Sequence, residues 1–338
     1  MNAKLTKGLA AAAISAAMML GAAAPALAKP NYGTGDQPEA YLNKSYTATG
    51  DGATAPSEAF KLTALTATNP AAESFATLPT VNTPSEINTT TPNYFVITLP
   101  DYDKVGEYTY TFSEQVPTKK TAGVTYDSEK YQLKVTVINE VKNENGQEVP
   151  TGKLIRKVAV RKSDDTSTNP NTKVADIVNT YKANTLTVGK EVEGILGDTS
   201  KEFTLTVTFD APKDTNWTNH IDAKSLDAQK ASVTKNGDTN TYTVKVKDGG
   251  KVTFKNVPDN AKYTVTEDGA KQDGYDPSGE VTSPTELKEN KTVTVINTKG
   301  GSVDTGVLLN NAPYIAIIGG AAVVAIYVVN KRRHSDMD

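Results

Sequence analysis

The sequence contains no cysteine and only two histidines, and these shortages exclude several classes of function. Without cysteine there is no disulfide, so a covalent staple would have to be of another kind. Zinc sites and nucleophilic triads need His or Cys, and no metal-ligand spacing occurs here. His334 lies in the C-terminal tail, and His220 has no identifiable partner for proton transfer. We therefore expect no metal, no cofactor and no enzymatic turnover.

An excess of basic charge is also missing. The chain carries 36 Lys and Arg against 39 Asp and Glu, which gives a formal net charge of −3. Nucleic-acid binders usually show a basic surface, so this balance gives no reason to expect a nucleic-acid partner.

Long apolar runs are confined to the two ends of the chain. At the start, Lys4 and Lys7 precede a short apolar stretch, and the small residues "PALA" at 25–28 follow it. This order predicts a secretory signal peptide over residues 1–28, cleaved after Ala28. An N-terminal membrane anchor is the alternative, but no longer apolar run follows the cleavage-like residues.

The C-terminal region, residues 301–338, carries a second apolar run. "SVDTG" at 302–306 is followed by an apolar segment at 313–329 and by the basic residues Lys331, Arg332 and Arg333. The segment is just long enough for a tilted membrane helix, whose basic flank would stay on the cytoplasmic side. Taken alone, this is an ordinary tail anchor.

Between the two ends, the chain is rich in Thr, Val and Tyr, with short strand-like runs separated by turn residues. We expect an all-β protein with two domains, residues 29–182 and 183–300, joined by a short connection near 181–185. Each half begins with a Lys-bearing strand, continues with a Tyr-rich strand that ends in Glu, and finishes on a strand that ends in Asn-Thr.

The alternation of side chains along these strands predicts that some polar residues point inward. Side chains in a strand alternate between faces, so in "GEYTYTFSE" Glu114 shares a face with Tyr110 and Phe112. The same reasoning predicts that five more polar side chains point inward, namely Lys44, Asn179, Lys190, Glu267 and Asn297. Each domain should therefore bury one Lys, one Glu and one Asn.

Two explanations fit such buried sets. The first is a buried Lys–Glu ion pair with Asn as a hydrogen-bonding neighbour. The second is chemical: apolar burial favours a neutral amine and a neutral carboxylic acid. The amine can then attack the Asn side chain, while the protonated Glu polarises the Asn carbonyl, shuttles protons and helps to expel ammonia. The product is a Lys–Asn isopeptide bond inside the domain.

The motifs "GEYTYTFSE", "GVTYDSEKYQLKV", "LTVGKEV" and "YTVTED" and the two Asn-Thr endings carry a resemblance. The chain resembles the two-domain major (backbone) pilins of Gram-positive sortase-assembled pili, whose immunoglobulin-like (Cna B-type) β-sandwich domains carry isopeptide bonds. The resemblance implies one bond from Lys44 to Asn179 with Glu114 as catalyst. It implies a second from Lys190 to Asn297 with Glu267.

The C-terminal order of motif, apolar segment and basic tail resembles a cell-wall sorting signal. In that family a sortase cleaves the Thr-Gly bond, here Thr305–Gly306, and joins the threonine carboxyl to a lysine of the next subunit. Asp304 stands where the family motif has proline, which leaves the sortase class open. The matching acceptor position is Lys173, with Lys162 as the alternative.

These features predict a secreted protein of the cell wall and the surface pilus, held at the membrane only as a precursor. Its partners would be a pilin-class sortase, identical subunits, tip and base pilins, and peptidoglycan. The alternative is a monomeric wall-anchored adhesin or a tip pilin that binds a host ligand.

Overall fold

The computed structural model describes residues 35–82, 93–164, 176–217, 220–271 and 273–301. The predicted signal peptide, Lys173, Thr305, Gly306 and the apolar segment 313–329 lie outside these ranges. No helix in the described ranges has the length and apolar character needed to cross a membrane.

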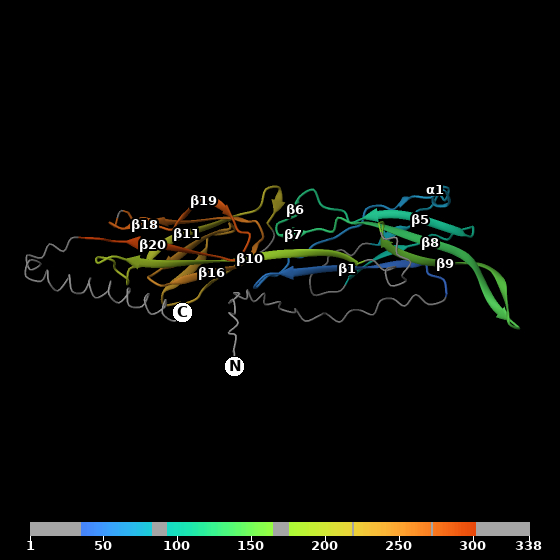
Figure 1. Ribbon diagram of the computed structural model, residues 1–338, viewed down its shortest axis with the longest axis horizontal. Helices are drawn as coiled ribbons and strands as arrows, with labels where there is room; N and C mark the ends of the chain where they lie inside the picture. Colours follow the sequence, from blue (N-terminus) through green and yellow to red (C-terminus); the bar gives the residue numbers. More distant parts are fainter. Residues whose placement is uncertain (1–34, 83–92, 165–175, 218–219, 272, 302–338) are drawn as a thin grey trace, which may run out of the picture.

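The fold is all-β, as the sequence predicts, and its first half forms two facing sheets (Figure 1). The one helix of the described ranges is the four-residue α1 (Pro70–Glu73). The first sheet contains β3 (Thr80–Asn82), β4 (Asn93–Thr98), β1 (Glu39–Thr49), the start of β10 (Asp176–Glu193) and β7 (Val124–Thr125). The second contains β2 (Thr66–Ala67), β5 (Gly106–Ser113), β8 (Lys130–Glu144) and β9 (Gln147–Lys162).

The second half repeats the two-sheet arrangement. One sheet contains β13 (Asp222–Ser225), β16 (Lys251–Pro258), the end of β10, β20 (Lys291–Thr298) and β18 (Asp276–Ser278). The other contains β14 (Ala231–Lys235), β15 (Thr241–Val246), β11 (Phe203–Asp210), β17 (Lys262–Asp268) and β19 (Val281–Glu286). The short strands β6 (Lys120–Thr121) and β12 (Thr215–Asn216) pair in parallel across the two halves.

Strand β10 belongs to both halves. It pairs in parallel with β1 from Asp176 to Lys182, and in parallel with β20 from Leu186 to Glu193. The connection expected near 181–185 is therefore not a loop: hydrogen bonds to β16 begin at Ala183, directly after those to β1 end, so the chain stays extended. One strand thus serves as the last strand of the first domain and the first strand of the second.

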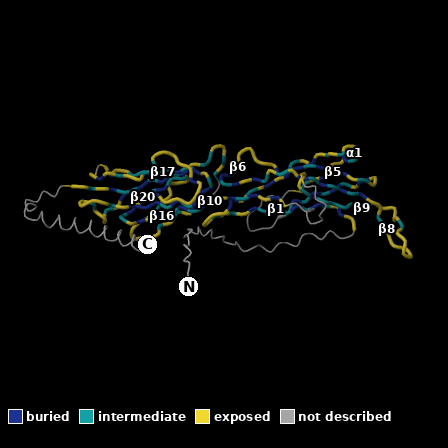
Figure 2. Tube along the Cα trace, viewed as in Figure 1, coloured by how far each residue is buried: buried dark blue, intermediate teal, exposed yellow. Residues whose placement is uncertain are grey.

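Alternating burial along the strands builds one main core in each half, and the second half has a further small cluster of Phe203, Ala270 and Tyr275 (Figure 2). In strand β5 every second residue from Tyr108 is buried, as the alternating pattern of the sequence predicts. The first core is rich in buried tyrosines, including Tyr46, Tyr110, Tyr131 and Tyr181. The second core is built mainly from Val, Leu and Phe.

Side chains and close backbone packing tie the two halves together at the junction. The side chain of Asn256 accepts a hydrogen bond from the backbone N–H of Thr54 at 3.0 Å and donates one to the carbonyl of His220 at 3.1 Å. Lys255 pairs with Asp51 at 2.7 Å. A Cβ placed on Gly50 would lie 2.0 Å from the carbonyl oxygen of Ala183, so only glycine fits there.

Gly50→Ala should lower the stability of the protein more than Gly237→Ala, a change at a glycine away from the junction. Both glycines have positive φ, +116° and +60°, but a Cβ at Gly237 meets nothing within 4 Å. Backbone strain is common to both variants, whereas overpacking, at about 1–3 kcal/mol, falls on Gly50→Ala alone. Thermal unfolding of the two variants measures the difference. Equal melting temperatures would contradict the packing at Gly50.

Candidate cross-linking sites

The first domain brings Lys44, Glu114 and Asn179 into contact. Both side chains of the Lys44–Glu114 pair are fully shielded from solvent, and the Lys44 Nζ donates to Oε2 of Glu114. The other carboxyl oxygen, Oε1, accepts a hydrogen bond of 2.6 Å from Nδ2 of Asn179. Glu114 therefore bridges the amine and the amide nitrogen.

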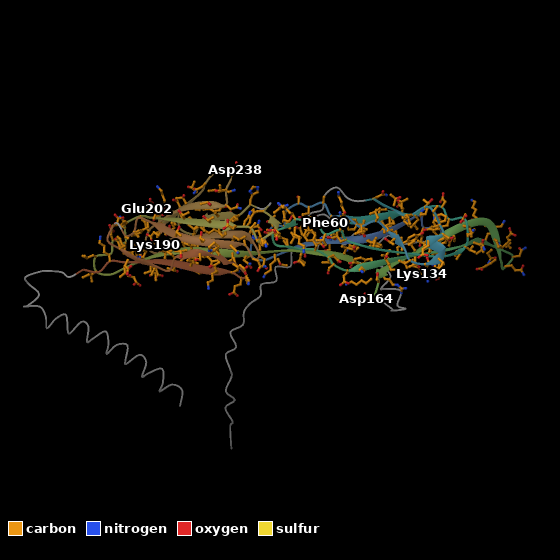
Figure 3. All side chains as sticks on the ribbon, turned by 90° about the horizontal axis from the view of Figure 1, so that it is seen from above. Phe60, Lys134, Asp164, Lys190, Glu202 and Asp238 are labelled. Carbon is orange, nitrogen blue, oxygen red and sulfur yellow. The ribbon has the colours of Figure 1, made fainter. Side chains whose placement is uncertain are left out.

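The second domain assembles Lys190, Glu267 and Asn297 in the same way. The Nζ of Lys190 lies 3.3 Å from Oε2 of Glu267, again between side chains with no exposed area. The Nδ2 of Asn297 donates to Oε1 of Glu267 at 2.6 Å. Figure 3 labels Lys190 within the body of the second domain.

Strand register explains why the two sets match. In the first domain Lys44 lies opposite Ile177 on the neighbouring parallel strand, two residues before Asn179. In the second, Lys190 lies opposite Val295, two residues before Asn297. Residues two apart share a face, so each lysine has to reach only diagonally across one strand spacing, about 4.8 Å, toward its asparagine. Each glutamate comes from the facing sheet.

Burial sets the protonation of these groups. Desolvation raises the pKa of Glu114 above its ordinary value, against the opposing effects of Lys44 and Asn179. Desolvation likewise lowers the pKa of Lys44, and the pKa of Lys190 falls for the same reason. Both directions favour the neutral amine and, in the first domain, the neutral acid.

An aromatic ring covers each lysine amine, which the sequence patterns did not reveal. The Lys44 Nζ lies 4.3 Å from the ring centre of Phe60, and the Lys190 Nζ lies 4.7 Å from that of Phe203. Phe60 follows a stretch with little strand pattern, and only the tertiary structure brings its ring over the amine of Lys44. These rings replace water on one side of each amine.

The two asparagine carbonyl oxygens have different surroundings. Oδ1 of Asn179 accepts a hydrogen bond of 2.8 Å from the backbone N–H of Asp127. Oδ1 of Asn297 is buried and has no hydrogen-bond donor within the described parts of the chain. The sequence contains no signal for this difference, since a backbone N–H is not visible in a residue pattern.

The other predicted positions lie apart from these two groups. Lys162, at the end of β9, has a side chain 47% exposed and pairs with Glu129 at 3.1 Å. His220 lines a surface hollow with Thr54, Asp222 and Asn256. Within the described ranges, no group of three or more His, Asp or Glu side chains could hold a metal ion.

Comparison with known proteins finds a family model that matches each half of the chain. Residues 41–182 match the Spy0128-like isopeptide containing domain, and residues 184–299 match a domain of unknown function (DUF7601). A curated pilin of Streptococcus pyogenes serotype M1 is 29% identical over 249 residues, covering 68% of this chain and 69% of that protein.

One solved structure adds a similarity of fold. The major pilin protein T3.2 of Streptococcus pyogenes matches with a TM-score of 0.51 at 18% identity, over 78% of this chain and 98% of that one. Another major pilin structure from that species has a TM-score of 0.48 at 19% identity, over 80% of this chain and all of the other.

The fold and the buried Lys–Glu–Asn groups define a tandem β-sandwich protein of the isopeptide-domain class. Residues 41–182 match the Spy0128-like isopeptide domain family, and the chain is similar to a curated pilin over 68% of its length. The resemblance to pilins drawn from the sequence is thereby confirmed.

Removing Lys44 should make the stability of the protein depend on the ionisation of Glu114. In Lys44→Met no bond can form, and the carboxyl loses the amine that lowers its pKa. Desolvation then raises the pKa of Glu114 in the folded state above its unfolded value. The contribution of the neutral carboxyl to the free energy of unfolding is therefore complete below the unfolded pKa, and it is lost as pH rises through the folded pKa.

Urea unfolding across pH measures this effect, and the double variant Lys44→Met/Glu114→Gln is its matched control. In the control, the free energy of unfolding should not fall as pH rises, because glutamine does not titrate. Parallel pH curves for the two variants would show that Glu114 is not held in its neutral form.

Proposed function

We propose that this protein is the shaft subunit of a covalent cell-surface pilus, and that each domain staples itself with a Lys–Asn isopeptide bond. Relatedness to the pilins identifies a pilus subunit. The observation that carries the finer proposal is the repetition of one Lys–Glu–Asn arrangement, in one strand register, in both buried cores.

The arrangement supports a balanced amide transfer. The neutral Lys44 amine attacks Cγ of Asn179 and passes a proton to Oε2 of Glu114. Oε1 of the neutral acid gives its proton to Nδ2 of Asn179, which leaves as ammonia. Glu114 is regenerated as the acid, and one C–N bond has replaced another. Glu267 has the same two contacts in the second domain.

This geometry refines the part expected of the glutamate. From sequence, Glu was expected to polarise the Asn carbonyl, shuttle protons and help to expel ammonia. The last two roles suit a carboxyl group that contacts the amine with one oxygen and the amide nitrogen with the other, whereas the first does not. Neither oxygen is placed to activate the Asn179 carbonyl, whose oxygen instead faces the Asp127 N–H.

The bonds would make the fibre resistant to pulling. Each joins the first strand of a domain to its last, and Asn179 and Lys190 lie on the same strand, β10. Tension could then pass from one bond to the next along the twelve residues of extended backbone from Asn179 to Lys190. A cross-link that closes most of a domain is also worth about 5 kcal/mol on the chain-entropy model.

Assembly would follow the sorting-signal chemistry. A pilin-class sortase would cleave Thr305–Gly306 and join the Thr305 carboxyl to Lys173 of the next identical subunit, or to Lys162. Lys162 is solvent-accessible at the end of β9. Tip and base pilins and peptidoglycan would complete the assembly on the secreted, wall-anchored fibre.

The intact mass of the purified full-length chain tests the internal bonds. We expect a mass lower than the sequence by about 17 Da for each bond, two ammonias in all. Glu114→Ala and Glu267→Ala should each restore one of these losses, whereas Glu129→Ala, which alters only a surface ion pair, should restore none. A wild-type mass equal to the plain sequence would overturn self-cross-linking.

A denaturing immunoblot of wall extracts from the native host tests the shaft function. Wild type should give a ladder of high-mass species, and Lys173→Ala should collapse it to a single band. Lys142→Ala, at another exposed lysine, is the control. Collapse with Lys162→Ala instead would move the acceptor, and a single wild-type band would favour the monomeric adhesin.

A further inference from the structure

The Asn179 carbonyl, unlike that of Asn297, faces a fixed hydrogen-bond donor. The backbone N–H of Asp127 lies 2.8 Å from Oδ1 of Asn179. On nucleophilic attack this oxygen is the atom on which negative charge develops. A preoriented N–H at that position stabilises such a transition state, as in the oxyanion holes of acyl-transfer sites.

The carboxylate of Asp127 holds this N–H in place. Its Oδ1 accepts a hydrogen bond from the N–H of Glu129 at 2.8 Å. Its Oδ2 accepts from the hydroxyl of Tyr131 at 2.9 Å and from the N–H of Val178 at 3.1 Å. Three donors on one carboxylate leave the residue little freedom to turn.

The path of the chain after β7 explains why the N–H is available. Strand β7 pairs with β10 only at Thr125–Thr180 and Val124–Tyr181. Two residues later the Asp127 side chain, rather than a backbone carbonyl, bonds to the Val178 N–H. The backbone has left the ladder there, so its own N–H is directed to the Asn179 side chain.

The second domain differs at the corresponding place. Strand β18 stays paired with β20, with Pro277 opposite Asn297 and Ser278 opposite Ile296. By register, Ser278 takes the place that Asp127 has in the first domain. Within the described residues, Oδ1 of Asn297 lacks a donor although it is buried.

We propose that the Asp127 N–H acts as the oxyanion donor for the Lys44–Asn179 bond and that the Asp127 carboxylate is its positioning group. This inference rests on the proposed self-cross-linking. The N–H can donate only to oxygen, so it also fixes the amide of Asn179 with its nitrogen toward Glu114, where the leaving ammonia takes its proton. During attack, Cγ of Asn179 becomes tetrahedral and Oδ1 becomes an oxyanion that accepts a hydrogen bond from this N–H. The carbonyl re-forms when ammonia departs.

An amide-to-ester substitution at residue 127 tests the donor directly. Cell-free translation with the α-hydroxy analogue of aspartate replaces only the N–H by oxygen, and it keeps the carboxylate whose charge also acts on Glu114. The full-length chain is quenched at timed intervals and digested, and both cross-linked fragments are quantified by mass spectrometry. The matched control places the same kind of ester at the exposed Ser128.

We expect the ester at 127 to slow formation of the Lys44–Asn179 bond by about 10²-fold. The Lys190–Asn297 bond in the same molecules should keep its rate and serves as an internal clock, and the ester at 128 should change neither rate. Tyr131→Phe, which keeps the N–H but removes one anchor of the carboxylate, should give a smaller slowing of the first bond alone.

The outcomes separate this inference from the function on which it rests. If both bonds form in wild type and neither the ester at 127 nor Tyr131→Phe slows the first, the oxyanion role of Asp127 is wrong and self-cross-linking stands. If neither bond forms in wild type, self-cross-linking itself is wrong. If the first domain of the ester variant resists folding, as judged by protease sensitivity, Tyr131→Phe decides alone.

Discussion

Strand β10 hydrogen-bonds in parallel to β1 in the first domain and to β20 in the second, and the candidate chemistry depends on this pairing. Parallel neighbours that start and finish a domain bring residues far apart in the sequence, such as Lys44 and Asn179, onto adjacent strands. The register then sets each lysine diagonal to its asparagine on the buried face. A shift of one residue would turn one of the two side chains to the outside.

Burial of the three polar groups in each domain gives this geometry its reactivity. Removing a charged group from water is costly unless it is well paired, so burial lowers the pKa of Lys44 and Lys190 and raises that of Glu114. The rings of Phe60 and Phe203 cover one side of these amines. The same contacts that suit a buried ion pair also suit amide transfer, because the glutamate touches the attacking and the leaving nitrogen at once.

The two domains are alike in the groups that move protons and differ in what surrounds the carbonyl oxygen. The first domain interrupts a short strand pairing at Asp127, while the second keeps its pairing through Pro277. Local backbone path, rather than the identity of the reacting residues, thus separates the two sites.

Sequence alone determined the all-β class, the twofold repeat and the inward direction of Lys44, Glu114, Asn179, Lys190, Glu267 and Asn297. These follow from two-residue periodicity, which is a local property of extended backbone. The tertiary structure decided that residues 181–185 continue one strand rather than forming a connection, because pairing to β16 holds that stretch extended. It also decided which rings cover the amines and which N–H meets Asn179. Those contacts join segments distant along the chain, and a backbone donor leaves no mark in the residue pattern.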